Sequence, residues 1–393
     1  MRIAVVSRIF VPEPSAASLI LQATVKAFSD LGHEVVVYTS TPPNGLAAGD
    51  DLPGVRVRRS WVKRDAQGYV RGYVSYMSFD IPVFFRLLFS RRADVYLVEP
   101  PPTTGAMVRV VAALKRAPYV YDAADLWSDA AAMVTSNRLV LRLLRAVERF
   151  AMRGASRAFA ISDGLVSRMR DIGIAIPATV VGFGAETGEF RHLGAEPSAA
   201  PFFVYGGSYS EWHGAGVFID AFEEVRRRHP DARLLFVGNG QERPVLEDAV
   251  ARRGIEGVEF RDPVSPADLA VLLNQATVSL ASLRPGHGYD YAFTTKVYSS
   301  LASGCPVIFS GIGPTIDFLA SSAAVQPVGV AVGYDSDEVA QAMLAAIASP
   351  LSAVRRREMS EWAAESFSLD SVGRRVATGA VAVAEAAART HPN

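Results

Sequence analysis

The run Ile3-Ala4-Val5-Val6 begins a strand–helix–strand pattern that extends to residue 38. Residues 15–31 carry apolar side chains at helical spacing, Gly32 marks the end of the expected helix, and Val35–Tyr38 is a second apolar run. Short apolar runs without alternation are typical of strands that are buried on both faces. The stretch therefore predicts a parallel sheet covered by helices on both sides.

The same alternation continues along the chain and restarts once. Residues 183–200 lack periodicity and are rich in glycine and proline, so we place a domain boundary there. The sequence predicts the α/β class, with two Rossmann-like, doubly wound parallel-sheet domains and a helical tail. The expected parts are a first domain over 1–187, a second over 188–366, and a helix over 367–393 that packs back on the first domain. We expect ligands at the carboxyl ends of the strands, in a cleft between the domains.

The composition is that of a globular protein. The 393 residues are 50% hydrophobic and 20% charged, unlike a disordered chain. The 40 basic and 40 acidic residues cancel, which argues against binding to nucleic acid. A single cysteine, Cys305, excludes an internal disulfide and a thiolate zinc cluster. No apolar run reaches the length of a membrane span and the N-terminus is typical of a strand, so we expect a cytoplasmic protein.

Basic residues are concentrated in the first half of the chain. Residues 1–190 contain 23 Lys and Arg against 17 Asp and Glu, whereas residues 191–393 contain 17 against 23. Within the first half, a helix predicted over 137–153 carries five arginines on one side and apolar residues on the other. Such a helix can lie on an anionic membrane. A basic face in solvent is commoner, so both interpretations stay open.

Two glycine-containing loops are candidates for binding a phosphate. Gly207 and Ser208 follow one predicted strand of the second half, and Gly238 and Asn239 follow the next. Glycine allows backbone N–H groups to approach a phosphate closely at the start of a helix. His213, shortly after the first loop, can donate to a phosphate oxygen or to a sugar hydroxyl. Ordinary tight turns and a solvated histidine are the alternatives.

The start of a helix predicted over 295–303 is a third candidate. Thr294 or Thr295 can cap this helix and leave free N–H groups at the positive end of its dipole. Lys296 is the only lysine after residue 115. A lysine beside a helix start predicts a diphosphate site, with an exposed cap and a surface lysine as the alternative.

Acidic residues follow a predicted strand of the first half. Asp122, Asp125 and Asp129 lie close to Trp127 in the sequence. Carboxylates can bind sugar hydroxyls and an indole ring can stack on a sugar ring, so this segment predicts sugar recognition. Solvated acids in a turn are the alternative.

Taken in order, these segments resemble those of the retaining glycosyltransferases of family 4, which have the GT-B fold. The most specific segments are Asp125-Leu126-Trp127 and a block that runs from Lys296 to Val307. The resemblance covers Met1 to about Phe367. The chain is similar in particular to the branch of this family that builds bacterial surface polysaccharides.

The chain departs from the family pattern at several positions. A Glu-x7-Glu pair, whose second member usually holds the nucleotide ribose, is replaced by Tyr291 and Ser299, and Asp290 could take part of that carboxylate role. The family often has Arg and Lys for the donor diphosphate where this chain has Ser208 and His213. The loop after the first strand, glycine-rich in the family, is Ser15-Ala16-Ala17.

The resemblance implies a metal-independent transferase of the hexosyltransferase type, without a cofactor. It moves a sugar with retention from a nucleoside diphosphate sugar to an acceptor hydroxyl of a glycan, a lipid-linked sugar or a small molecule. The second domain would bind the donor and the first the acceptor. The expected catalytic residues are Asp125, His213 and Lys296; the donor-binding residues are Gly207, Ser208, Gly238, Asn239, Asp290, Thr294, Thr295 and Ser299; the acceptor-binding residues are Ser15, Ala16 and Trp127.

Two other functions are open at this stage. A non-catalytic pseudo-glycosyltransferase that serves as a partner subunit would explain Tyr291 and Ser299. A nucleotide-sugar epimerase on the same fold is less favoured, because its carboxylate set is not evident. A lipid-linked acceptor would place the cytoplasmic protein at the inner face of the membrane.

Overall fold

The structure, a computed structural model, consists of two compact units. The first unit contains Met1–Gly182 together with Leu369–Asn393, and the second contains Phe183–Ser368. The structure describes residues 1–13, 15–43, 46, 52–65, 70, 73–194, 196–286 and 288–390.

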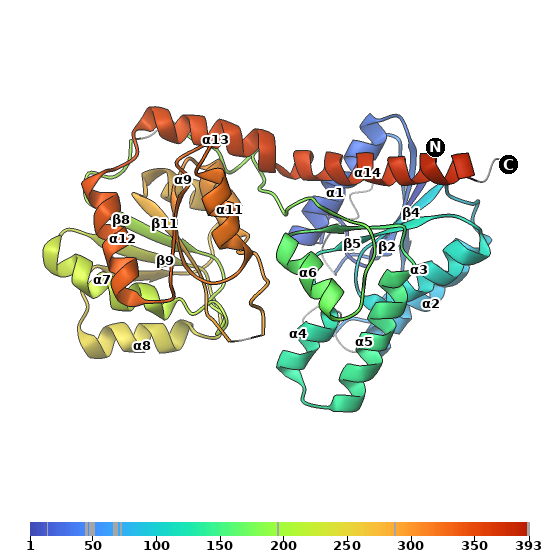
Figure 1. Cartoon of the computed structure of the whole chain (residues 1–393), viewed down its shortest axis with the longest axis horizontal. Helices are drawn as coiled ribbons and strands as arrows, with labels where there is room; N and C mark the ends of the chain where they lie inside the picture. The colour runs from blue at the N-terminus through green and yellow to red at the C-terminus, as the bar shows by residue number, and fades with distance from the viewer. Residues whose placement is uncertain are drawn as a thin grey trace. The chain divides into compact units, whose positions relative to one another are not determined.

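The first unit is built on a seven-stranded sheet in which every strand runs parallel to its neighbours (Figure 1). Its order is β3-β2-β1-β4-β5-β6-β7, with Ile3 of β1 opposite Val35 of β2 and Val95 of β4. The strands are β1 (Arg2–Val6), β2 (Glu34–Ser40), β3 (Val55–Ser60), β4 (Val95–Val98), β5 (Tyr119–Ala123), β6 (Arg157–Ala160) and β7 (Ala178–Val180).

The last helix of the chain belongs to the first unit. Helix α14 (Leu369–Thr390) packs along α1 (Ala16–Asp30) and against β4 and β6. A Cβ atom at Gly373 would lie 2.6 Å from the backbone of Ala23, so the two helices touch through their main chains. The remaining helices are α2 (Tyr73–Phe89), α3 (Pro102–Leu114), α4 (Trp127–Val134), α5 (Arg138–Arg153) and α6 (Asp163–Asp171), and α3 contacts both α2 and α5.

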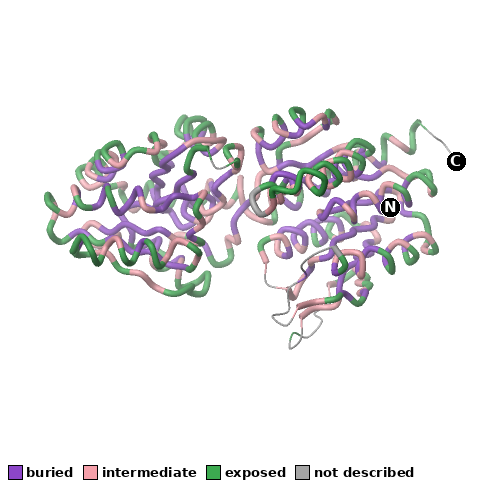
Figure 2. The backbone as a smooth tube through the Cα atoms, turned by 90° about the horizontal axis from the view of Figure 1, so that it is seen from below, coloured by how far each residue is buried: buried purple, intermediate pink, exposed green. Residues whose placement is uncertain are grey.

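The second unit has a six-stranded parallel sheet of order β10-β9-β8-β11-β12-β13. The strands are β8 (Phe202–Gly206), β9 (Arg233–Val237), β10 (Val258–Arg261), β11 (Val278–Leu283), β12 (Val307–Gly311) and β13 (Gly329–Val332). The helices are α7 (Gly216–Arg228), α8 (Arg243–Arg253), α9 (Pro266–Gln275), α10 (Lys296–Ala302), α11 (Pro314–Ser322), α12 (Ser336–Ala348) and α13 (Ala353–Phe367). Figure 2 shows buried backbone along the central strands and exposed backbone on the outer sides of the helices.

The predicted fold class, two doubly wound parallel sheets with a helical tail, is confirmed. The sequence analysis missed the edge strands β3 and β13. Their residues are largely half-buried or exposed, so neither strand has the continuous apolar run that marks a buried strand. No helix of the described ranges is long and apolar enough to cross a membrane.

A buried arginine joins two helices of the second unit. Arg356 of α13 is 1% exposed, and its guanidinium donates to the carbonyl oxygens of Leu273, Asn274 and Ala276 at 2.7–3.1 Å. These carbonyls lie at the C-terminal end of α9, where a helix leaves its last acceptors without internal partners. Arg356 therefore satisfies the end of α9 and fixes α13 against it.

We predict that Arg356→Met lowers the free energy of unfolding by about 3–5 kcal/mol, because buried carbonyl groups lose charged donors. Denaturation in urea, followed by circular dichroism, measures the change. Arg355→Met is the matched control, since Arg355 is exposed and pairs with Glu358. Its effect should stay within about 0.5 kcal/mol. Equal effects of the two substitutions would contradict the role given to Arg356.

Candidate functional site

The candidate site of the second unit lies where the order of its sheet reverses. The chain proceeds from β8 to β9 on one side and returns to β11 on the other side of β8. Ligands of open parallel sheets bind outside the carboxyl ends of the strands at such a point. The loops after β8 and β9 and the segment between β11 and α10 all begin at this edge.

The loops after β8 and β9 touch through their backbones. The N–H of Gly207 donates to the carbonyl of Val237 at 2.8 Å, and the N–H of Tyr209 donates to that of Asn239 at 3.2 Å. Gly238 has a φ of +141°, and a Cβ atom there would lie 2.0 Å from the carbonyl oxygen of Gly207. Gly238 is thus required for the close approach of the two loops, whether or not a phosphate binds there.

Lys296 places a buried ammonium group beside the first loop. Its Nζ lies 3.9 Å from the centre of the Tyr205 ring, and a Cβ atom at Gly207 would lie 3.6 Å from it. Nζ is buried, and no hydrogen-bond partner for it occurs among the described residues. Burial lowers the pKa of Lys296 to about 7. A cation that is held only by a ring face is poised to accept an anionic ligand.

His213 is buried near this lysine and is not a solvated loop residue. Only 6% of it is exposed, and Nδ1 accepts a hydrogen bond from the N–H of Ser210 at 3.4 Å. Burial, and next the charge of Lys296, lower the pKa of His213 to about 3. The imidazole is therefore neutral at pH 7, with its proton on Nε2, and can donate one hydrogen bond.

The start of α10 differs from the expected cap. Thr295 occupies the N-cap position, but its side chain makes no capping hydrogen bond. The N–H of Thr294 donates to Oγ1 of Thr315 at 3.1 Å, so this amide is already engaged. The helix has only seven residues, which weakens the dipole on which the expectation relied. Ser299 lies one turn after Lys296 and is half-buried.

Three other predicted donor-binding residues lie on exposed loops. Ser208 and Asn239 are exposed, and Oδ1 of Asn239 accepts from the N–H of Gly240 at 2.8 Å. Asp290 is exposed and accepts from the N–H of Gly286 at 3.2 Å. The structure thus brings Gly207, His213 and Lys296 together. Tyr205, which the sequence analysis did not select, completes this group; its position as the last aromatic residue before Gly206-Gly207 was the available signal.

The predicted acceptor residues lie at the corresponding edge of the first unit. Asp125 follows β5 and is exposed, while the surrounding protein raises its pKa to about 6 by desolvation. Trp127 begins α4, and its backbone N–H donates to Oε1 of Glu148 at 2.6 Å. Its ring stands edge-on to the ring of Tyr76, with 5.3 Å between the ring centres. Ser15 accepts from the N–H of Ser18 as the N-cap of α1, and the exposed Ala16 is the first residue of that helix.

The three neighbouring carboxylates have different environments. Asp129 pairs with Arg168 at 2.7 Å and with Arg145 at 3.5 Å, so it links α4 to α5 and α6 and does not face solvent as an open sugar ligand. Asp122 lies in β5 and is buried. Of the three, Asp125 alone keeps an exposed side chain.

Family models match both halves of the chain. Residues 17–184 match the glycosyl transferase 4-like domain, and residues 200–349 match glycosyl transferases group 1. The chain belongs to the GT-B glycosyltransferases. No curated protein matches it in sequence.

Solved structures share the fold of this glycosyltransferase. Sucrose-phosphate synthase from Thermosynechococcus elongatus is 17% identical, with a TM-score of 0.75 over 98% of this chain and 100% of that one. The Anabaena protein HepE in complex with UDP is 17% identical, with a TM-score of 0.69 over 97% and 100%. The α,α-trehalose 6-phosphate synthase from Burkholderia multivorans is 14% identical, with a TM-score of 0.69 over 99% and 98%.

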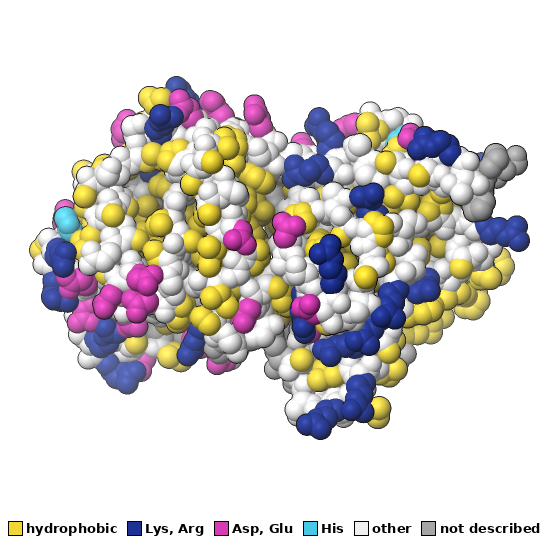
Figure 3. Space-filling view, viewed as in Figure 1, with side chains coloured by type: hydrophobic (Ala, Val, Ile, Leu, Met, Phe, Trp, Pro, Cys, Tyr) yellow, Lys and Arg dark blue, Asp and Glu magenta, His cyan; other side chains and the backbone are white. Residues whose placement is uncertain are grey.

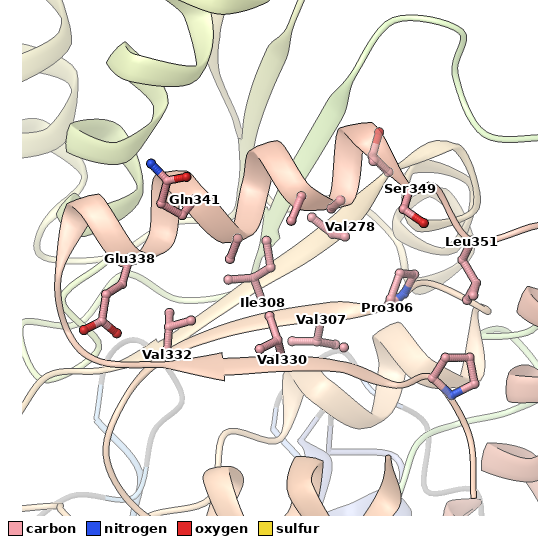
Figure 4. Close-up of a pocket in the computed structure, with 16 residues that line it drawn as sticks. Val278, Pro306, Val307, Ile308, Val330, Val332, Glu338, Gln341, Ser349 and Leu351 are labelled. Carbon is pink, nitrogen blue, oxygen red and sulfur yellow. The ribbon is translucent and has the colours of Figure 1, made fainter. Parts of the chain in front are cut away.

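The second unit of the glycosyltransferase also contains an apolar cavity of about 680 Å³. Figure 4 shows Val278, Ile308 and Val330 around it, between α12 and strands β11 to β13. These residues lie near the amino ends of the strands, opposite the edge that carries Lys296. The cavity therefore does not belong to the site described above, and its lining has few groups that could hold a diphosphate.

The basic helix of the first unit differs from the expected arrangement. Arg145 pairs with Asp129, and Arg149 and Arg153 donate to the carbonyls of Ile172 and Gly173. Several apolar side chains of the helix are exposed, namely Leu139, Val140, Leu143 and Phe150. The reason is that α5 contacts the rest of the unit partly through its polar side, and its first turns extend beyond that contact (Figure 1).

We predict that Lys296 titrates near pH 7 in the ligand-free glycosyltransferase. The chain has four lysines, Lys26, Lys63, Lys115 and Lys296, so NMR of protein labelled with ¹³C-lysine can follow each side chain. Lys26 is the internal control, because its hydrogen bond to Asp30 raises its pKa. Lys296→Arg identifies the signal. A Lys296 signal that stays charged up to pH 9 would show that the ammonium has a partner.

Proposed function

We propose that this glycosyltransferase moves a sugar from a nucleoside diphosphate sugar to an acceptor hydroxyl, with retention of configuration and without a metal ion. The observation that carries the proposal is the buried ammonium of Lys296, which has no hydrogen-bond partner among the described residues and lies against Gly207 at the switch point of the second sheet. The Anabaena protein of the same fold is described with UDP and with UDP-glucose, which supports a nucleotide-sugar donor.

Lys296 and His213 supply the electrostatic part of the proposed reaction. The bond from the anomeric carbon to the diphosphate oxygen breaks, the anomeric carbon bonds to the acceptor oxygen on the same face, and negative charge develops on the leaving diphosphate. A diphosphate beside Lys296 raises the pKa of the amine again, and the ammonium then stabilises the departing group. The neutral His213 donates from Nε2 to a phosphate oxygen or a sugar hydroxyl. A donor phosphate oxygen on the same face takes the acceptor proton.

The remaining predicted residues have supporting roles in this proposal. Gly207 and Gly238 allow the loops after β8 and β9 to lie close together. The side chains of Ser208, Asn239 and Ser299 would contact the nucleotide. Thr294, Thr295 and Asp290 belong to the segment that leads into α10. In the first unit, Asp125 orients the acceptor hydroxyl and Trp127 offers its ring to a sugar, with Ser15 and Ala16 at the start of α1.

We predict that Lys296→Met weakens the binding of UDP by about 1.5–3 kcal/mol at pH 7, the range for a hydrogen bond to a charged group. In the wild type, the affinity should fall as the pH rises above 7, by up to tenfold per unit, because the free protein loses the charge that the diphosphate needs. Lys296→Arg keeps its charge and should remove this dependence. Titration calorimetry from pH 6.5 to 9 measures both effects.

Lys26→Met is the control for loss of a lysine, since Lys26 is exposed and lies in the first unit. Its affinity and pH dependence should equal those of the wild type. If Lys296→Met binds UDP as tightly as the wild type, the diphosphate lies elsewhere. If GDP, dTDP or ADP binds and UDP does not, the same variants test the site with that nucleotide.

We also propose that the first unit contacts an anionic membrane on the cytoplasmic side, where a lipid-linked acceptor would lie. Helix α2 exposes Ile81, Phe85 and Phe89 at helical spacing, and α5 exposes Leu139 and Leu143. The acidic residues of α2, α3 and α5 are Asp80 and Glu148, and both are buried. Figure 3 shows hydrophobic and basic side chains together over this part of the unit. An apolar surface surrounded by cations is suited to anionic lipid.

We predict that the protein sediments with vesicles of anionic lipid at low salt and dissociates as salt increases, since each basic residue contributes about 1 kcal/mol and is screened beyond about 8–10 Å. Arg138→Gln with Arg142→Gln should weaken binding at low salt. Phe85→Ser with Phe89→Ser should weaken the part that resists salt. Val245→Ser, an exposed apolar position of the second unit, is the control. No sedimentation of the wild type at low salt would exclude this contact.

A further inference from the structure

The first unit has its own switch point, and an arginine lies directly at it. The order of its sheet reverses between β1 and β4, so their carboxyl ends border the crevice where open sheets bind ligands. Arg8 follows β1 by two residues, and Glu99 follows β4 directly. Asp122 lies near the end of the neighbouring β5. None of these residues was selected for binding an anion from the sequence.

Arg8 is buried without a hydrogen-bond or ion-pair partner in the described part of the chain. Its side chain makes no hydrogen bond or ion pair with any residue of the described ranges, and Nε is fully buried. The residue keeps 8% of its surface exposed. The nearest aromatic ring, that of Tyr76, is centred 5.7 Å from the guanidinium carbon. The guanidinium of Arg356, which is also buried, donates to three carbonyl groups, so a buried arginine of this chain can be satisfied by the protein itself.

The acidic groups near Arg8 have other partners, although Oδ2 of Asp80 is buried without a hydrogen-bond partner among the described residues. Glu99 accepts from the hydroxyl of Ser7 at 2.6 Å, and Asp80 accepts from that of Thr104 at 2.6 Å. Glu13 pairs with Arg64 at 2.9 Å. Burial, and next the neighbouring Asp122, raise the pKa of Glu99, and burial raises the pKa of Asp122. Burial therefore favours the protonated form of Glu99, and no carboxylate of the described residues forms an ion pair with Arg8.

A buried guanidinium without partners destabilises a protein unless a ligand supplies the missing acceptors. The fork of an arginine fits the two oxygens of a carboxylate or phosphate. The protonated Glu99 could in addition donate to a ligand oxygen. We propose that Arg8 binds a carboxylate or phosphate group of the acceptor, so that the acceptor of this glycosyltransferase is an acidic sugar or a phosphorylated one.

This inference rests on the proposed function for the identity of the ligand as acceptor, but its test does not need a donor. Titration calorimetry compares glucuronate, methyl phosphate and glucose as probes. We expect glucuronate or methyl phosphate to bind at least tenfold more tightly than glucose. The tighter of the two identifies the anion as carboxylate or phosphate. Arg8→Met should remove this preference, and Arg8→Lys should retain part of it.

A second measurement separates this site from Lys296. The anion preference should persist in Lys296→Met; if it is lost there and kept in Arg8→Met, the anion binds at Lys296 and the inference is overturned. If UDP fails to bind but Arg8 still selects anions, the proposed donor fails and the inference stands. Equal affinity of the wild type for all three probes would overturn it.

Thermal unfolding in the absence of anions provides the third readout. Arg8→Met should unfold at the same temperature as the wild type or a higher one, because it removes a buried charge that has no partner. Arg157→Met is the matched control, since Arg157 of the same unit donates to Thr179 at 2.7 Å and its loss should lower the unfolding temperature. A comparable decrease for Arg8→Met would show that the protein itself satisfies Arg8, and would overturn the inference.

Discussion

Every strand of both sheets runs parallel, and parallel strands can be joined only by crossovers that cover the faces of the sheet. Two consequences follow from this constraint. The inner strands must be apolar on both faces, which explains the near-complete burial of β1, β4, β5, β8, β11 and β12. Polar groups that bind ligands are therefore restricted to the loops at the strand ends, and the chain places Gly207, His213 and Lys296 at such an edge in one unit and Arg8 and Asp125 in the other.

Arg356, Lys296 and Arg8 are three cations whose charged groups are buried, but they differ in what surrounds the charge. Arg356 donates to three carbonyls at the end of α9, so it holds two helices together. Lys296 has only the ring face of Tyr205, and Arg8 has no hydrogen-bonding partner among the described residues. Desolvation disfavours all three charges, but hydrogen bonds within the protein offset this cost for Arg356 alone among the three. The other two lie at the switch points of their sheets, where a ligand is the remaining source of acceptors.

The structure shows which elements carry the charge difference between the two halves of the chain. Part of the excess of basic residues in the first half lies on α2, α3 and α5, whose acidic side chains are buried and which expose aromatic and aliphatic side chains. In the second unit, by contrast, arginines on the helices are largely paired with nearby acids, as in Arg228 with Glu224 and Arg253 with Asp220. The two units thus present different surfaces to solution although their folds are alike.

The sequence by itself determined the fold class, because the period of apolar residues and the glycine stops report local structure directly. It also selected Gly207, His213 and Lys296 as candidates, because they lie in loops that follow predicted strands and at the start of a predicted helix. Only the tertiary structure decided how each group is satisfied. The amide of Thr294 donates to Thr315, and Asp129 pairs with two arginines. The ring of Tyr205 faces Lys296, whereas Arg8 has no hydrogen-bond partner among the described residues. The burial of a side chain and its hydrogen-bond partners depend on residues that are far apart in the chain. The spacing of residues along the sequence does not show which of them come into contact.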